Sequence, residues 1–228
     1  MSEDNGLHTP LGSASSARRR SQALAAVNIV AKATAVALSL YPLAAPGKPQ
    51  FHGKAMRPRA IAYPLVALAV PVTWLRRGRP APYPHAADLL LGLPLILDAG
   101  ANTFDVYRRV KNFDLLVHAV NALFGVTAFG AALSPLMPNR WSAAALATSL
   151  GISGAALWEV AEYAALKSGE TGLELSYENT MLDVATSAVG AAAGGIITVV
   201  LLWPRRAEVG ALFGWRLVER PLRAPRST

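Results

Sequence analysis

Residues 112–131 of the chain read NFDLLVHAVNALFGVTAFGA. A helix needs about 20 mostly apolar residues to cross a bilayer, and this stretch supplies them. It nevertheless begins with an aspartate and a histidine four residues apart, Asp114 and His118. Residues at this spacing lie on one face of an α-helix. Because ionisable groups inside membrane spans are costly and are usually functional, this face is the first candidate for a site.

Besides Asp88 near the start of the third apolar segment, four more carboxylates lie within other apolar segments. The segments cover residues 86–100, 141–166 and 179–204, and the carboxylates are Asp98, Glu159, Glu162 and Asp183. Asp98 and the two glutamates stand near the ends of their segments, whereas Asp183 stands near the start of its segment. Successive spans run in opposite directions, so all these groups and the Asp114–His118 pair are expected in one leaflet. At a rise of 1.5 Å per residue they lie about 5–10 Å below the membrane surface.

The composition is that of a multi-span membrane protein. Of the 228 residues, 53% are hydrophobic and 16% are charged, whereas soluble domains carry about 25% charged residues. The apolar residues also come in blocks rather than at amphipathic spacing. We therefore predict an all-α, polytopic transmembrane helix bundle of about six spans. The expected spans are residues 23–45, 60–75, 86–100, 112–131, 141–166 and 179–204.

The chain divides into three parts. Residues 1–20 are polar and predict a disordered cytoplasmic tail, residues 21–206 form the transmembrane domain, and residues 207–228 form a basic tail with an apolar piece that suits the membrane surface. A signal peptide is the competing interpretation of the first apolar run. Its length and Lys32 favour a retained helix. In the last span the sequence GAAAG at residues 190–194 predicts close packing of two helix backbones.

The formal net charge of +8 does not indicate nucleic acid, because the basic residues flank the apolar runs. They stand at residues 18–20, 76–79, 108–111 and 205–206, where they suit anionic lipid headgroups. The lipid bilayer is therefore the expected partner. The chain has no cysteine, which excludes disulfides, thiolate metal sites and cysteine nucleophiles.

The embedded ionisable groups need compensation. Each charged residue deep in a span costs about 2.5–3.5 kcal/mol, so six unpaired groups would cost on the order of 15 kcal/mol. The expected spans place no lysine or arginine among them. Arg108 and Arg109 lie in the connector on the same side and are candidates for binding a substrate headgroup. Two explanations remain: a bound metal ion, or a carboxylate cluster that shares protons.

The metal hypothesis names specific ligands. We expect Asp114, His118, Glu159 and Asp183 to converge, with Asp98 and Glu162 as additional ligands. An oxygen-rich site with one imidazole suits zinc, iron or manganese. His118 and Glu159 are also the candidate catalytic acid and base groups. The competing interpretations are a capping aspartate, a histidine bonded to the backbone, and glutamates that reach outward to the interface.

Three quoted motifs resemble those of a known group of proteins. FDLLVHAVNALFG, ALWEVAEYAAL and SYENTMLDVATSAVGAAAGG resemble, in order, the motifs of the VanZ-like and YjdF-like multi-pass proteins of the bacterial inner membrane. The match covers about residues 94–200. Glu162 and Asp98 fit the YjdF-like pattern better, since VanZ-like proteins more often place a glutamine near Glu162. The resemblance implies a small plasma-membrane protein of unestablished activity.

Three classes of function remain open. The first is a membrane-embedded enzyme that acts on a lipid-linked or small hydrophobic substrate, with the carboxylates and His118 as metal ligands or acid and base groups. The second is a proton- or cation-coupled transporter, and the third is a structural or regulatory protein whose polar cluster only fixes helix packing. The confinement of the polar groups to one leaflet weakens the transporter, and the lack of an evident nucleophile leaves enzymatic activity undecided.

The number of spans and the distribution of basic residues predict that both termini are cytoplasmic. Reporter fusions made after Gly78 and after Arg206 should therefore both give the cytoplasmic signal. Opposite signals from the two fusions would reject six spans, and two external signals would invert the orientation.

Overall fold

The computed structural model describes residues 11–212, except 53, 80–82 and 170–174. Its long helices are α1 (Leu11–Ala44), α2 (Met56–Arg76), α3 (His85–Thr103), α5 (Phe113–Leu133), α6 (Arg140–Lys167) and α7 (Tyr177–Ile197). Short helical segments connect or follow them: η1 (Pro49–Phe51), α4 (Val106–Arg109), η2 (Ser134–Leu136), η3 (Thr198–Leu202), η4 (Trp203–Arg205) and α8 (Arg206–Leu212). The prediction of an all-α helical bundle is confirmed.

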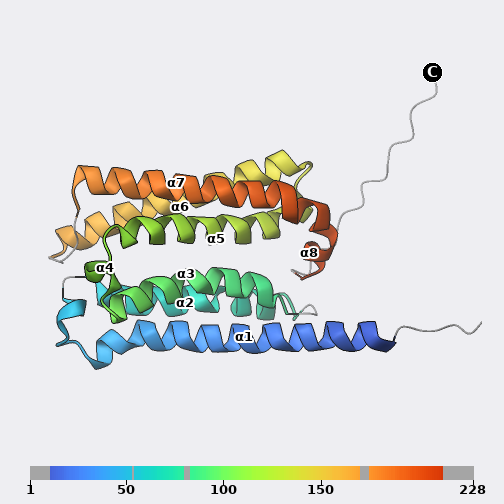
Figure 1. Ribbon diagram of the computed structural model, residues 1–228, viewed down its shortest axis with the longest axis horizontal. Coiled ribbons are helices and arrows are strands. Elements are labelled where there is room, and N and C mark those ends of the chain that lie inside the picture. The colour runs from blue at the N-terminus through green and yellow to red at the C-terminus, as the bar shows by residue number, and fades with distance from the viewer. Residues whose placement is uncertain (1–10, 53, 80–82, 170–174, 213–228) are drawn as a thin grey trace, which may run out of the picture.

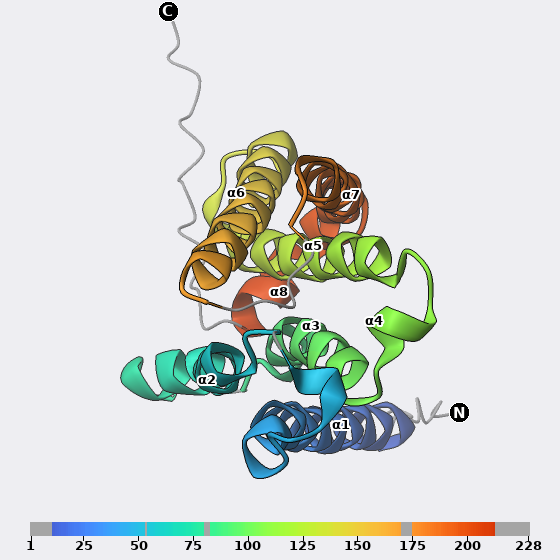
Figure 2. The same cartoon turned by 90° about the vertical axis from the view of Figure 1, so that its left-hand side faces the viewer.

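The long helices run roughly parallel or antiparallel to one another in two groups (Figure 1). Helices α1, α2 and α3 form one group, and α5, α6 and α7 form the other (Figure 2). Helix α3 packs against α1, α2 and α5, so it joins the two groups. Helix α4 and the α1–α2 loop lie at one end of the bundle, and α8 lies at the other (Figure 1). We call the end that holds α4 the site end.

Five helices in the described part of the chain are long and apolar enough to cross a membrane: α1, α2, α5, α6, and α7 with its continuation to Gly210. Helix α3 is the third expected span but does not meet this standard, because its 19 residues include Asp88, Asp98 and Asn102. It lies alongside the other long helices in both views (Figures 1 and 2). Its polar side chains are buried against its neighbours rather than turned outward.

Two helices begin earlier than expected. Helix α1 starts at Leu11, so residues 11–20 of the predicted tail are helical, while residues 1–10 lie outside the described part. The alanines and arginines of this stretch are good helix formers, which accounts for the extension. Helix α2 starts at Met56 instead of residue 60, and this places Arg59 inside the helix. The tail beyond residue 206 continues as α8, and residues 213–228 are outside the described part.

The close packing expected of the GAAAG stretch is confirmed. A β-carbon built on Gly190 would lie 1.9 Å from the backbone oxygen of Ala119 in α5. One turn later, a β-carbon on Gly194 would lie 2.7 Å from the β-carbon of Val126. Only glycine permits this approach of the α5 and α7 backbones. Because Ala119 follows His118, the contact also brings His118 next to the first half of α7.

Gly190→Ala should therefore destabilise the protein by about 1–3 kcal/mol, because α7 must move away from α5 to admit the methyl group. Gly154→Ala on α6 is the matched control, since a β-carbon there meets nothing within 4 Å. That change should be neutral or stabilising by up to about 1 kcal/mol from helix propensity. Unfolding of both variants in detergent measures the difference. Equal stabilities would mean that α5 and α7 do not touch at Gly190.

Lys32 connects α1, α2 and α3 toward the end of the bundle opposite the site end. Pro71 in α2 has no N–H group, so the carbonyl of Ala67, four residues earlier, lacks its helical partner. The ammonium group of Lys32 in α1 donates a hydrogen bond to this carbonyl. It also pairs with Asp88 Oδ1 of α3 at 2.8 Å. The proline thus creates an acceptor that an embedded lysine satisfies.

Asp88 is almost fully buried and has further donors. Its Oδ2 accepts hydrogen bonds from Asn28 Nδ2 at 2.8 Å and from the Tyr83 hydroxyl at 2.6 Å. Burial and the bond to Asp88 raise the pKa of Tyr83, which precedes α3. The charge of Asp88 is therefore compensated from both α1 and the α2–α3 connection.

Lys32→Met should cost about 3 kcal/mol of unfolding free energy, because Asp88 loses its counter-ion while it stays buried. Adding Asp88→Asn to Lys32→Met should recover part of that loss, since the double variant carries no unpaired charge. The measurement is unfolding in detergent, with Lys111→Met at an exposed position as the control. Wild-type stability of Lys32→Met would contradict the role of the pair.

Candidate functional site

The predicted site residues of α5, α6 and α7 meet at the site end of the bundle. Asp114 and His118 occupy the first two turns of α5. Glu159 lies in the last third of α6, which runs toward this end, and Asp183 lies in the second turn of α7, which leaves it. The alternation of helix directions therefore brings the four side chains to one level, in the manner expected from the sequence.

His118 is the centre of this group, which we call the His118 cluster: Asp114, His118, Glu159 and Asp183. Its Nε2 atom lies 3.7 Å from Asp114 Oδ1 and 3.9 Å from Asp183 Oδ1. Its Nδ1 atom lies 3.8 Å from Glu159 Oε1. All three separations exceed the length of a direct hydrogen bond. One imidazole therefore faces three carboxylates without a direct hydrogen bond to any of them.

The separations suit a bridging cation. Two atoms that each lie about 2.1 Å from a zinc ion are at most about 4.2 Å apart. Both distances from His118 Nε2 fall within this limit. One ligand atom from each of Asp114, His118 and Asp183 lies within 4.8 Å of the others. Small rotations of the side chains would bring all three to an ion of this kind.

Two buried carboxylates of the cluster have oxygens with no hydrogen-bond donor among the described residues. Asp183 is 1% exposed; its Oδ2 accepts a hydrogen bond from Asn179 Nδ2 at 2.6 Å, whereas its Oδ1 has no donor. Glu159 is 6% exposed and neither of its oxygens has a donor. A buried carboxylate oxygen without a partner carries a large desolvation cost. These atoms therefore point to a cation or a proton that the described part of the chain does not supply.

The two nitrogens of His118 have different surroundings. Nε2 faces the two aspartates, whereas Nδ1 faces Glu159 and the hydroxyl of Ser187, which lies 3.4 Å away. Histidines that bind metals in proteins commonly donate their second N–H to a carboxylate or another oxygen. Ser187 stands one turn after Asp183 on α7, so one helix contributes to both sides of the ring.

Asp98 and Glu162 belong to a second group, centred on Arg59 of α2. The guanidinium group donates to Asp98 Oδ2 at 2.8 Å and Oδ1 at 3.0 Å, and to Glu162 Oε1 at 2.9 Å. The expectation that no basic residue lies among the embedded carboxylates is therefore wrong. It rested on a span that began after Arg59, whereas α2 contains this residue and directs it inward. The guanidinium carbon also lies 5.0 Å from the ring of Trp158.

Asp98 is surrounded by donors. Besides Arg59, the hydroxyl groups of Tyr63 and Tyr107 and the amide of Asn102 donate to its carboxylate. The Tyr107 bond is 2.6 Å long, and burial together with the charge of Asp98 raises the pKa of Tyr107. An aspartate with this many donors is held in place as an anion. It would lose most of these bonds if it turned toward His118.

Lys54 and Tyr107 are polar residues of the site end that the sequence reasoning missed. The ammonium nitrogen of Lys54 is buried, has no hydrogen-bond acceptor among the described residues, and lies 5.4 Å from the centre of the Tyr107 ring. Burial and the charge of Arg108 lower the pKa of Lys54. Lys54 and Tyr107 stand in polar connections, which gave no sequence signal to separate them from solvated residues.

The two connector arginines differ. Arg108 donates to the carbonyl of Pro49 at 2.6 Å, and its Nε lies 3.1 Å from Asp105 Oδ1. It thereby ties α4 to the loop between α1 and α2. Arg109 is exposed. The headgroup role expected for this pair stays a prediction.

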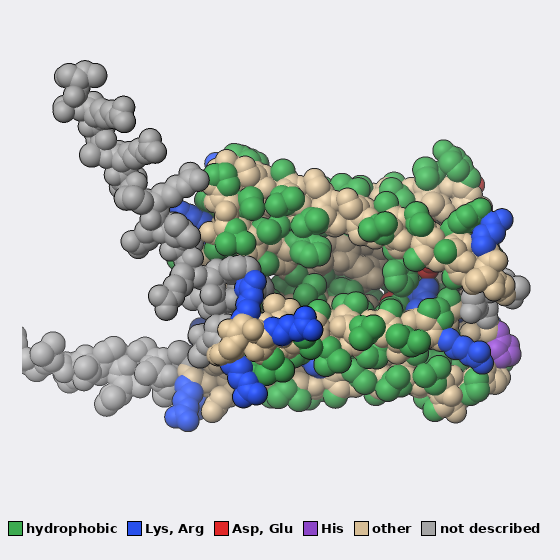
Figure 3. All heavy atoms as spheres, turned by 180° about the vertical axis from the view of Figure 1, so that it is seen from behind, with side chains coloured by type: hydrophobic (Ala, Val, Ile, Leu, Met, Phe, Trp, Pro, Cys, Tyr) green, Lys and Arg blue, Asp and Glu red, His purple; other side chains and the backbone are tan. Residues whose placement is uncertain are grey.

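The space between the two groups of helices is open on one side. Figure 3 shows a hollow between them on the rear face of the bundle, with acidic and basic side chains visible inside it near one end. The hollow is bordered by hydrophobic side chains on the same face (Figure 3).

One comparison with known proteins gave a match. A family model described as predicted membrane protein (DUF2238) matches residues 27–204, more than half of the chain. The match supports a membrane-protein family of unknown function and does not support the VanZ-like or YjdF-like grouping, which stays a prediction. No curated protein and no solved structure matches the chain.

Proposed function

The chain belongs to the DUF2238 family of predicted membrane proteins, and we propose that it is a metal-dependent enzyme of the bilayer that acts on a lipid-linked or small hydrophobic substrate. The observation that carries this proposal is the His118 cluster. The His118 imidazole, whose side chain is 11% exposed, faces three carboxylates at 3.7, 3.8 and 3.9 Å, and two of those carboxylates have oxygens without a donor among the described residues. A purely structural cluster would pair these oxygens within the protein.

The geometry favours Asp114, Asp183 and Nε2 of His118 as the metal ligands. Three protein ligands leave a position for substrate or water, as in catalytic zinc sites. Zinc, iron and manganese all suit this donor set. A bound ion of this kind would polarise a carbonyl or phosphoryl oxygen and increase the acidity of water.

Glu159 takes a separate role in this arrangement. Its carboxylate lies on the Nδ1 side of His118, away from the two aspartates that approach Nε2. It can orient the ring by accepting a hydrogen bond from the Nδ1–H group, and it is the nearest candidate to take a proton from a substrate. Glu162 and Asp98 then serve as counter-charges that hold Arg59, rather than as ligands.

The charged residues beside the cluster suit an anionic headgroup. Arg59 is fixed by its two carboxylates, whereas the ammonium group of Lys54 is buried without an acceptor in the described part of the chain. A phosphate or carboxylate on the substrate would supply that acceptor. Arg109 is exposed near the same connector and is available for a peripheral contact.

A transporter is the second candidate. One observation favours it: α3 carries a paired aspartate toward each end, Asp88 with Lys32 and Asp98 with Arg59. The sequence had suggested that the polar groups are confined to one leaflet. The Asp88–Lys32 pair shows that they also occur away from the site end. In this alternative the His118 cluster shares protons instead of holding a metal ion.

Metal analysis of the purified protein tests the proposal. Wild type should carry about one zinc, iron or manganese ion per chain, and His118→Ala and Asp183→Asn should carry none. Glu159→Gln should retain metal with an affinity lowered about 10- to 100-fold, because it removes an outer partner rather than a ligand. Chelator treatment should lower the melting temperature of wild type to that of His118→Ala.

Glu178→Gln is the matched control, since Glu178 is an exposed acid in the first turn of α7. It should keep the wild-type metal content and melting temperature. A wild-type protein without metal, together with a more stable His118→Ala variant, would reject the metal site and favour the proton-sharing cluster.

A further inference from the structure

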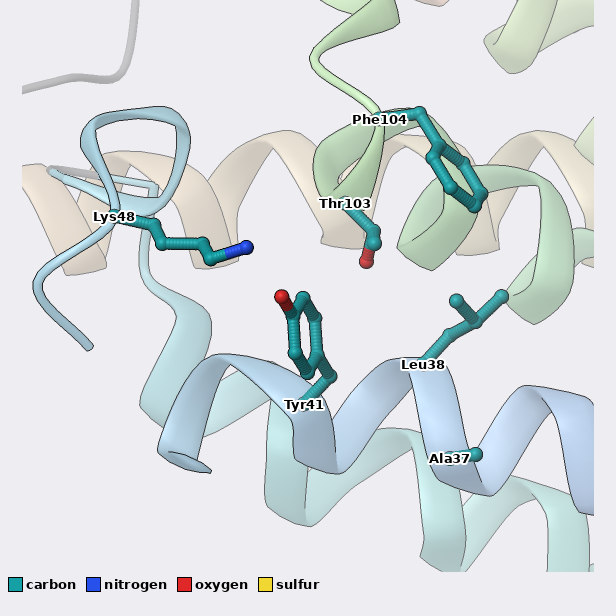
Figure 4. A pocket seen from close by; sticks show the side chains of 6 residues that line it. All are labelled: Ala37, Leu38, Tyr41, Lys48, Thr103 and Phe104. Atoms are coloured by element: carbon teal, nitrogen blue, oxygen red, sulfur yellow. The ribbon is translucent and has the colours of Figure 1, made fainter. Parts of the chain in front are cut away.

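A cavity lies at the site end, on the side of the bundle formed by α1 and α3. Its volume is about 430 Å³, and it is lined by Ala37, Leu38, Tyr41, Lys48, Thr103 and Phe104 (Figure 4). None of these six residues belongs to the His118 cluster or to its charged neighbours. We call this cavity the α1–α3 pocket.

The polar side chains of the pocket converge. Figure 4 shows the Lys48 ammonium group and the hydroxyl groups of Tyr41 and Thr103 directed toward one region. The hydroxyl oxygen of Thr103 is buried and has no hydrogen-bond partner among the described residues. None of the six lining residues is acidic, so the charge of Lys48 is not balanced within the pocket. The polar half therefore offers one cation and two hydroxyl groups to an anion.

This polar half is built by a folded loop. The Lys48 ammonium nitrogen lies 5.1 Å from the centre of the Tyr41 ring, and Phe51 packs edge-on against that ring at 5.7 Å. The side chain of Gln50 donates to the backbone oxygen of Thr103 at 3.3 Å, and thus fastens the loop to the end of α3. The three polar groups are therefore presented by packed segments on both sides.

The other half of the pocket is apolar and opens outward. Ala37 is exposed on α1, and Phe104 is 64% exposed just after α3. Leu38 packs toward α3, where a β-carbon on Gly100 would lie 3.8 Å from its methyl group. Starting from Tyr41, the apolar side chains lie further along α1 toward its middle, and therefore toward the hydrocarbon region of the bilayer (Figure 4). The α1–α3 pocket thus changes from polar to apolar along the direction in which a lipid lies.

We propose that the α1–α3 pocket binds an anionic phospholipid of the surrounding bilayer. Lys48, Tyr41 and Thr103 contact the phosphate and the polar part of the headgroup, and Ala37, Leu38 and Phe104 contact the first carbons of an acyl chain. The position suits this ligand, since α1 ends at Ala44 and α3 ends at Thr103. Lysine and tyrosine are the usual residues at the headgroup level of membrane proteins.

The occupant is an intact lipid rather than a free anion. A lone phosphate would contact the polar half and leave the exposed apolar half without a partner. A neutral or zwitterionic lipid would fill the apolar half without fully using the charge of Lys48. The site does not depend on the proposed metal centre, because the two share no residue.

Native mass spectrometry of the detergent-solubilised protein tests the assignment. Phosphatidylglycerol and phosphatidylcholine with identical acyl chains are titrated against wild type, Lys48→Gln and Lys167→Gln. Wild type should bind phosphatidylglycerol about tenfold more tightly than phosphatidylcholine, the effect of one hydrogen bond to a charged group. Lys48→Gln should lose this preference, and Thr103→Val should lose part of it.

Lys167 is the matched control because its ammonium nitrogen lies 5.3 Å from the centre of a tyrosine ring, that of Tyr163, much as Lys48 lies near Tyr41, but it does not line the pocket. Lys167→Gln should keep the full preference. The proposal is overturned if wild type binds both lipids equally, if the two lysine variants lose the preference equally, or if glycerol phosphate displaces the lipid. Metal content should be unchanged in Lys48→Gln, so failure of this test and failure of the metal site are separate results.

Discussion

The ion pairs of Arg59 connect the two groups of helices and determine which carboxylates of the site end remain for the His118 cluster. Arg59 comes from α2, Asp98 from α3 and Glu162 from α6, so one guanidinium group joins three helices. In an apolar environment such a pair persists because each partner would be costly alone. Two carboxylates are thereby committed to Arg59, whereas Glu159 and Asp183, which face His118, keep oxygens without a hydrogen-bond donor from the described part of the chain.

Helix α3 shows how a polar helix is accommodated in an apolar bundle. Among the long helices of the described part of the chain it alone is not a candidate membrane span, and its aspartates meet Lys32 on α1 and Arg59 on α2. Pro71 of α2 also contributes to this pairing, because it leaves the carbonyl of Ala67 without its helical partner and Lys32 donates to that carbonyl. Pairing within the bundle therefore replaces hydration, which the hydrocarbon region cannot provide.

The sequence predicted the helices and the His118 cluster for simple physical reasons. Runs of apolar residues predict spans, and alternating directions predict that Asp114 and Asp183 lie at the same level. The role of Arg59 could not be predicted in this way, because an arginine next to an apolar run is usually an interfacial residue. Whether its side chain turns outward or inward depends on Asp98 and Glu162, which are 39 and 103 residues away. Lys54 and Tyr107 were missed for the same reason, since tertiary contacts alone bury them.

The charge balance at the site end bears on what the His118 cluster can hold. Asp98 and Glu162 share Arg59, so the positive charge of this arginine is already balanced and does not neutralise the cluster. Asp114, Glu159 and Asp183 then carry up to three negative charges around a single imidazole. One divalent ion balances the two aspartates on the Nε2 side, and an imidazole N–H directed at Glu159 meets the third carboxylate on the Nδ1 side. A single shared proton balances only one of these three charges, so a cluster with one proton and no metal leaves two of them unbalanced. The division of the three carboxylates between the two nitrogens of His118 is therefore the feature that favours a cation.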